Sequence, residues 1–272
     1  MRGRPASART SGGAAPAEPR DSCFPAQAAA PRRPAIPAVK AALVRQRILA
    51  IFLPVTAVLY VSAEALDPKG TDRIVTTVAA GLQLLPIAAS HPAQLYLAGT
   101  PSLLALGALA VSYAAIAVLV TGRGWVIATV AAVLGGIGAF CGAIVNVLVG
   151  VNLAAAATAH MPADAAARFL MTSFNSGAGQ FFTYLYFVSE YTAPLVMGVA
   201  LWRSRSVPRW LAVLFAAGFE LAAAQSAKGP VVIAFMLPWV IAMVLLAARI
   251  WQAAARPAVP QPESVLRPAI SS

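Results

Sequence analysis

The chain has 272 residues, of which 60% are hydrophobic and 11% are charged. Soluble domains carry roughly 25% charged residues, so this composition excludes an ordinary water-exposed domain and indicates a chain solvated largely by lipid. The net charge is +11. The cations lie in the N-terminal segment and between apolar runs, not in a patch with interleaved aromatic residues, which argues against nucleic-acid binding.

The first 40 residues are predicted to form a disordered, basic cytoplasmic tail. Residues 1–40 are rich in Ala, Pro, Arg and Gly and contain almost no large apolar side chains, so burial cannot offset the entropy lost on ordering. Two interpretations stay open for this segment: a basic arm on anionic lipid, or a spare extension from a misassigned start. A second disordered cytoplasmic tail is predicted at 253–272, which leaves 41–252 as the membrane domain.

Six apolar runs follow one another along that domain. The first, Ile48–Leu66, would form a helix about 28 Å long, which matches the hydrocarbon core of a bilayer. Polar segments such as "TGRG" and "RSRSVPR" separate the runs. The pattern predicts an all-α, polytopic bundle of six transmembrane helices, of which the fifth is the shortest. The runs are Ile48–Leu66, Leu95–Val120, Trp125–Val149, Phe181–Leu201, Trp210–Gln225 and Val231–Ala248.

The moderately apolar segment Thr71–Ser90 decides the number of spans, since it suits either an interfacial helix or a seventh span. If Arg2, Arg4, Arg9 and Arg20 of the far tail are left out, 12 cations lie on the side of the N-terminus and 4 lie on the other with six spans. With seven spans the ratio becomes 7 to 9. The positive-inside rule therefore favours six spans in the cell membrane, an interfacial helix between the first and second, and two cytoplasmic termini. The 12 are Arg32, Arg33, Lys40, Arg45, Arg47, Arg123, Arg203, Arg205, Arg209, Arg249, Arg256 and Arg267, and the 4 are Lys69, Arg73, Arg168 and Lys228.

Small residues and one proline predict local features of two spans. The third run contains "GGIGAFCG", in which Gly135, Gly138 and Gly142 thin one stretch of helix. Because close backbone approach stabilises helix pairs in lipid, these glycines are predicted to pack helices within the chain. In the fourth run Pro194 has no N–H group, so the carbonyl of Glu190 loses its helical partner. A helix bend is predicted there.

Acidic and polar residues inside the apolar runs are the candidate site. Glu190 lies near the centre of the fourth run, Glu220 lies about 9 Å from the outer end of the fifth, and Glu64 lies two residues from the end of the first. An acid at membrane depth costs roughly 2.5–3.5 kcal/mol unless it faces a partner, a cavity or water. A ligand-binding pocket is therefore predicted. Its predicted residues are Glu190, Glu220, Glu64, Asn146, Tyr186 and Tyr191.

Three function classes follow from these acids. The leading hypothesis is a non-enzymatic membrane protein that transports or senses a small solute, or a proton, through an outward-opening acidic pocket. The alternative is an accessory or scaffold protein in which Glu190, protonated and hydrogen-bonded to Asn146 or a tyrosine, only joins helices. The third, a membrane-embedded enzyme, needs His91 or His160 to reach the acids.

Motifs for known cofactors and metals are missing from the sequence. It contains no P-loop, dinucleotide fingerprint, G-x-S-x-G or H-E-x-x-H, and it has no Cys/His cluster of the kind that binds zinc. No cofactor and no metal are therefore predicted, and the only partners predicted are the lipid bilayer and the solute or proton. The pattern specifies neither the solute nor the oligomeric state.

Two stretches carry a resemblance. "SAEALDPKGTD" at Ser62–Asp72 and "LWRSRSVPRW" at Leu201–Trp210 resemble stretches of small multi-span bacterial membrane proteins that have no assigned activity. The resemblance covers about Ile48 to Trp251. It implies a membrane location and a helical fold, and it implies no activity and no site residues.

Overall fold

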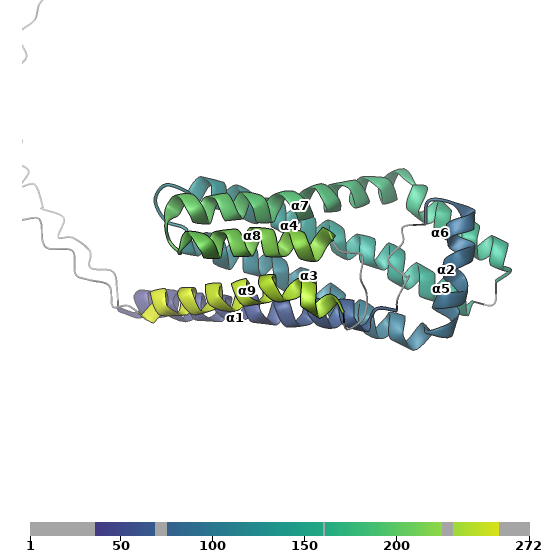
Figure 1. Cartoon of the computed structure of the whole chain (residues 1–272), viewed down its shortest axis with the longest axis horizontal. Helices are drawn as coiled ribbons and strands as arrows, with labels where there is room; N and C mark the ends of the chain where they lie inside the picture. The colour runs from purple at the N-terminus through teal and green to yellow at the C-terminus, as the bar shows by residue number, and fades with distance from the viewer. Residues whose placement is uncertain (1–35, 69–74, 160, 225–230, 256–272) are drawn as a thin grey trace, which may run out of the picture.

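The computed structural model describes residues 36–68, 75–159, 161–224 and 231–255. In these ranges the chain is helical and contains no strand (Figure 1). The predicted tails fall mostly outside them, as do Lys69, Arg73, His160 and Lys228. The helical elements are α1 (Ile36–Leu66), α2 (Val78–Ser90), α3 (Pro92–Leu119), α4 (Trp125–Asn146), the π-helical segment η1 (Val147–Val151), α5 (Asn152–Thr158), α6 (Ala163–Asn175), α7 (Gly177–Ser204), α8 (Arg209–Ala224) and α9 (Val232–Ala255).

Six of these helices form a closed ring. α1 packs against α3, α3 against α4, α4 against α7, α7 against α8, α8 against α9, and α9 returns to α1. Large apolar side chains fill the interior of the ring, among them the fully buried Leu53, Met197, Phe215 and Trp239. Each helix is therefore held by two neighbours, and its remaining face carries exposed apolar residues.

Five described helices are long and apolar enough to cross a membrane: α1, α3, the α4–η1–α5 segment, α7 and α9. This confirms the predicted all-α fold with several helices of membrane-spanning length. The sixth member of the ring, α8, has 16 residues, which is roughly 24 Å of helix. It lies between α7 and α9. α7 runs through the buried Pro194 as one helix, and the predicted bend there stays a prediction.

A cap of short helices covers one end of the ring (Figure 1). The third predicted span extends beyond Val149, because the π-helical segment η1 carries the helix on into α5. α6 was not predicted, although Ala166, Leu170 and Phe174 recur at helical spacing and are buried. α6 packs on α2, which begins at Val78, later than the predicted Thr71. The cap thus has its own small apolar core, formed by α2, α5 and α6.

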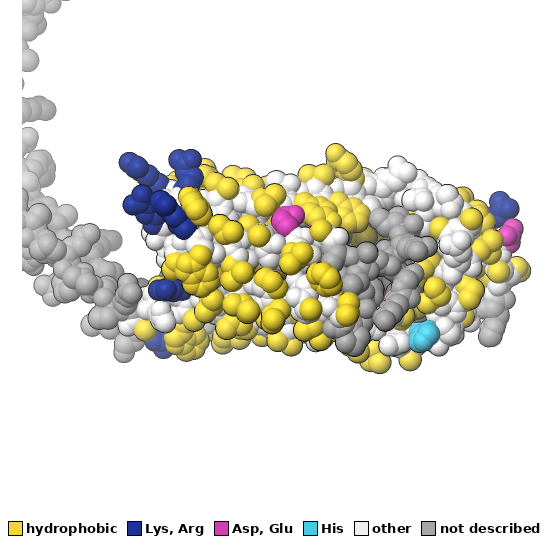
Figure 2. Space-filling view, viewed as in Figure 1, with side chains coloured by type: hydrophobic (Ala, Val, Ile, Leu, Met, Phe, Trp, Pro, Cys, Tyr) yellow, Lys and Arg dark blue, Asp and Glu magenta, His cyan; other side chains and the backbone are white. Residues whose placement is uncertain are grey.

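Arginines gather at the opposite end of the ring, where α1 starts, α9 ends, and the α3–α4 and α7–α8 turns lie (Figure 2). Two of their guanidinium groups lie over tryptophan rings: Arg47 over Trp251 at 5.4 Å and Arg209 over Trp202 at 5.1 Å. On the face that Figure 2 shows, the described surface between the two ends is largely apolar. The described arginines at this end are Arg45, Arg47, Arg123, Arg203, Arg205, Arg209 and Arg249.

Glycines bring the ring helices into close contact. Three of them, on α4, are the predicted packing positions, and they face side chains of α3 and α7. On α8, Gly218 approaches the backbone of α9: a Cβ added there would lie 2.8 Å from the Trp239 nitrogen. Lipid offers no hydrophobic force that would hold helices together, so van der Waals contact at these close approaches stabilises the helix pairs instead. The α4 contacts are Gly135 with the Tyr113 ring, Gly138 with the Ser189 Cβ, and Gly142 with the Tyr186 ring.

The α8–α9 contact predicts a stability change. Replacing Gly218 by Ala should lower the free energy of unfolding by about 1–3 kcal/mol, the usual cost of overpacking, because the new methyl group meets backbone that cannot rotate away. Gly136→Ala is the control, since a Cβ at Gly136 meets nothing within 4 Å. Unfolding of the purified protein in detergent measures both. Equal effects of the two substitutions would show that α8 does not pack on α9 in this way.

Candidate functional site

A cavity of about 390 Å³ lies inside the ring, in the half nearer the cap. The cavity is partly open and is lined by the C-terminal part of α1, the N-terminal part of α3, the end of α4 with η1 and the start of α5, the first half of α7 and the last residues of α8. Its polar lining residues are Tyr60, Glu64, Asp67, Ser102, Asn146, Tyr186, Glu190 and Tyr191, and apolar side chains from the same helices complete the wall.

Glu190 is held inside the ring by tyrosines. The Tyr60 hydroxyl on α1 donates a hydrogen bond to Oε1 of Glu190 on α7, with 3.0 Å between the oxygens. The hydroxyl of Tyr186, one turn earlier on α7, interacts with both of these groups. The Tyr60 ring is itself fixed edge-on against Trp239, with 5.6 Å between centroids. The Glu190 carboxyl group therefore faces α1 across the bundle and does not point into lipid.

Asn146 joins two further helices at the same cavity. Its Oδ1 accepts a hydrogen bond from Ser102 Oγ on α3 at 3.0 Å, and its Nδ2 donates to the Gly142 carbonyl at 3.2 Å. Immediately after Asn146 the α-helix widens into η1, from which Val149 and Gly150 line the cavity. Single π-helical turns within α-helices occur often at functional sites, and this one borders the candidate site.

An aromatic series on α7 forms one wall. The rings of Tyr186 and Phe187 lie 5.3 Å apart, and those of Phe187 and Tyr191 are stacked at 6.5 Å with 19° between their planes. The Tyr191 hydroxyl donates to the carbonyl of Ala223 at 3.3 Å, in the last turn of α8, where carbonyls lack helical partners. This bond ties the aromatic wall to the end of α8.

Five of the six predicted ligand-binding residues come together here: Glu64, Asn146, Tyr186, Glu190 and Tyr191. Their binding role stays a prediction. Glu220 does not line the cavity, although it lies only two residues before Ala222, which does. Its Oε1 atom is buried without a hydrogen-bond partner in the described part of the chain.

Sequence reasoning missed some lining residues. Tyr60 precedes Glu64 by four residues, and that spacing places both on one helix face. The sequence could therefore have identified Tyr60 as a lining residue. Ser102 has no comparable signal, because it is an ordinary helical serine until α4 brings Asn146 against it. Asp67 and Phe187 also line the cavity and are not among the six predicted ligand-binding residues.

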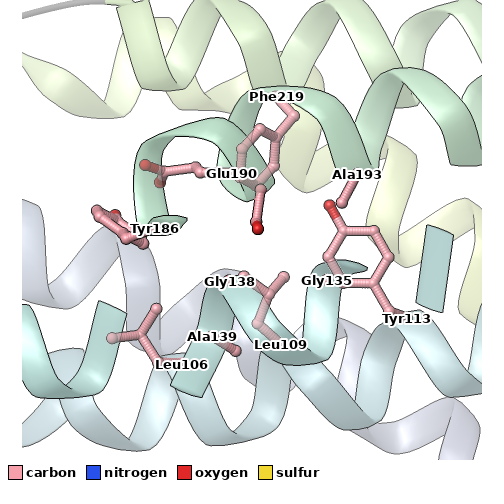
Figure 3. A pocket seen from close by; sticks show the side chains of 11 residues that line it. Leu106, Leu109, Tyr113, Gly135, Gly138, Ala139, Tyr186, Glu190, Ala193 and Phe219 are labelled. Carbon is pink, nitrogen blue, oxygen red and sulfur yellow. The ribbon is translucent and has the colours of Figure 1, made fainter. Parts of the chain in front are cut away.

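A smaller void of about 10 Å³ adjoins the cavity, since Leu106, Tyr186 and Glu190 line both. Figure 3 shows it between Glu190 and Tyr113. Ser189 also lines the void; it is 1% exposed, and its Oγ has no hydrogen-bond partner among the described residues. The void is about the size that holds one water molecule, and the hydroxyl beside it lacks a partner.

The described lining of the large cavity is acidic. Glu64, Asp67 and Glu190 line it, and no described Lys, Arg or His does. His91 ends α2 and hydrogen-bonds with Ser90 and the Ile87 carbonyl, outside the cavity. Within the described ranges, no group of three or more His, Cys, Asp and Glu side chains is placed to hold a metal ion.

Comparison of the chain with protein families, with curated proteins and with solved structures gives no match in any of the three. The resemblance to small bacterial membrane proteins therefore stays a prediction.

The Tyr60–Glu190 hydrogen bond predicts a measurable coupling. Tyr60→Phe removes the donor and should lower the free energy of unfolding by about 0.6–2 kcal/mol, the range for hydrogen bonds between helices in membranes. Tyr184→Phe is the matched control, because Tyr184 lies on α7 and is 75% exposed. Unfolding in detergent, combined with Glu190→Ala in a double-mutant cycle, gives the coupling energy, because Ala removes the acceptor. Additive effects of Tyr60→Phe and Glu190→Ala would contradict the bond.

Proposed function

We propose that this chain is a multi-span protein of the cell membrane that binds a small solute through Glu190 and so transports or senses it. The observation that carries the proposal is the cavity of about 390 Å³ bordered by an acidic side chain that two tyrosines orient. Small-molecule sites usually measure about 300–1,000 Å³ and place a few polar groups in a largely apolar wall. The volume of this cavity falls within that range.

The alternative function, an accessory or scaffold protein, is favoured by one observation: the bond from Tyr60 to Glu190 joins α1 to α7. An acid that only joins helices needs a partner and close packing around it, because voids forfeit contacts between the lining atoms. Glu190 instead borders a large cavity. That difference supports binding over a purely structural role.

The same carboxyl group suits a cationic solute or a proton. A carboxylate at membrane depth is costly unless it meets a partner charge, water or a proton, so a cation entering the cavity gains from neutralising it. The third class, a membrane-embedded enzyme, lacks support, because a second catalytic group has to reach the acid and His91 lies outside the cavity. His160 falls outside the described residues.

For the orientation, we propose six spans with α8 as the fifth, α2 as an interfacial helix, and both termini cytoplasmic. Support comes from the arginines at one end of the ring and the partly exposed Trp125, Trp202, Trp210 and Trp251 near them, since cytoplasmic loops are rich in cations and tryptophan favours membrane interfaces. In this arrangement the cap and the adjoining cavity face outward.

The proposed orientation predicts the outcome of reporter fusions. Fusions after Arg123 and after Arg205 should report a cytoplasmic location, because both lie at the arginine-rich end, and a fusion after Ala163 should report an external one. Paired reporters, each active on only one side of the membrane, measure this when normalised to the amount of fusion protein. The reverse pattern at any of the three positions would make the topology wrong.

The proposed binding role predicts the effect of removing one charge. Glu190→Gln keeps the size and hydrogen-bonding capacity but cannot carry charge, so it should abolish solute binding or uptake while the protein still inserts and resists heat in detergent. Asp164→Asn is the matched control, since Asp164 is exposed and pairs with Arg168 on α6. A binding screen on purified protein and uptake into proteoliposomes measure both.

The scaffold alternative predicts a different pattern. If Glu190 only joins helices, Glu190→Gln should be nearly silent in every assay, and Glu190→Ala should destabilise the protein by about 0.6–2 kcal/mol. That result, with no solute whose binding depends on Glu190, would overturn the proposed function.

A further inference from the structure

The size of the cavity indicates which kind of cation it suits, a bare metal ion or a small organic cation. A bare metal ion takes its ligand oxygens at about 2.0–2.6 Å, so it fills only a small part of a cavity of about 390 Å³. The described residues also offer no cluster of three or more His, Cys, Asp and Glu side chains for such an ion. The space instead suits a small organic molecule, whose carbon atoms can contact the apolar lining, including Leu95, Leu106 and Leu153.

The wall beside the acid is aromatic. Tyr186, Phe187 and Tyr191 all line the cavity, and Phe187 and Tyr191 keep 37% and 36% of their surface exposed. Phe187 has no polar side-chain atom, so it offers a ligand only apolar contact and the negative face of its ring. Aromatic faces attract organic cations, and aromatic side chains recognise quaternary ammonium ligands in this way.

The acid and the aromatic wall adjoin each other. Tyr186 belongs to the aromatic series and also interacts with the Glu190 carboxyl group, and Figure 3 shows the two side chains next to each other. A ligand that meets Glu190 is therefore within reach of the ring faces. The hydrogen bond from Tyr60 keeps the carboxyl group turned toward the inside of the ring.

We propose that the solute is an organic ammonium ion, whose charged group lies against the Glu190 carboxylate and the aromatic wall formed by Tyr186, Phe187 and Tyr191. This inference rests on the proposed function and names the class of its ligand. The carboxylate supplies the opposite charge, the rings supply the cation–π attraction, and the apolar lining covers the carbon substituents. A neutral solute would gain no charge attraction from the carboxylate, and an inorganic cation would leave the aromatic wall unused.

Binding to the purified full-length chain in detergent tests the class of ligand. The probes are methylammonium, tetraethylammonium, choline and phenylethylammonium, with the neutral choline isostere 3,3-dimethylbutan-1-ol, Na⁺ and Mg²⁺ for comparison. At least one ammonium probe should bind, and its binding should be lost in Glu190→Gln. If choline binds, the neutral isostere should bind at least about tenfold more weakly, because it lacks the charge that the rings and the carboxylate attract.

Substitution of the central ring tests the aromatic contribution. Phe187→Leu should weaken ammonium binding about tenfold, since a partly exposed ring gives a cation–π attraction between the values for exposed and desolvated sites. Phe187→Trp, which offers a better ring face, should retain it. Phe181→Leu is the control, because Phe181 lies on α7, is 60% exposed and does not line the cavity. Should Phe187→Leu fail to fold, the retained binding of Phe187→Trp and the isostere comparison still decide.

The outcomes separate this inference from the proposed function. Glu190-dependent binding of the neutral isostere, Na⁺ or Mg²⁺, with no ammonium probe bound, overturns the ammonium inference and leaves a solute-binding protein. Ammonium binding that is equally strong in Phe187→Leu overturns the role of the aromatic wall. If no probe binds in a manner that depends on Glu190, the ammonium inference is wrong, and the broader solute screen then decides the proposed function.

Discussion

The hydrogen bond between Tyr60 and Glu190 is the interaction on which the rest of the site depends. It joins residues 130 positions apart and turns an acidic side chain away from lipid into the ring of helices. A carboxyl group at this depth needs a partner, and the partner has to come from another helix. Because Tyr60 is itself held by Trp239 on α9, three helices together set where the acid points.

The cavity exists because close packing is confined to part of the ring. Near the middle of α4, Gly135, Gly138 and Gly142 bring the helix tightly against α3 and α7. One turn beyond Gly142 the chain passes Asn146 and widens into η1. From there α5 leads into the cap, which packs around its own apolar core instead of filling the ring. Tight packing on one side and the cap on the other leave space beside Glu190.

Much of the site was predictable because membrane burial makes polar residues conspicuous. Glu190, Glu64 and Asn146 stand out in apolar runs, and all three line the cavity. Glu220 stands out equally but does not line the cavity. Ser102 does not stand out at all, yet it holds Asn146 in place. The free-energy cost of burying a polar side chain implies that it has a partner. It does not identify the residue that provides the partner.

The sequence by itself determined the all-helical class, the apolar helices and the segregation of arginines, because each follows from local composition and from the length of a bilayer-sized run. It did not determine the cap. The helix α6 is amphipathic, with Ala166, Leu170 and Phe174 buried on one face, but its sequence does not show that this face packs on α2. Nor did it determine which acid meets which tyrosine. That choice depends on helix rotation and neighbour order in the ring, which arise from contacts between residues far apart in the chain.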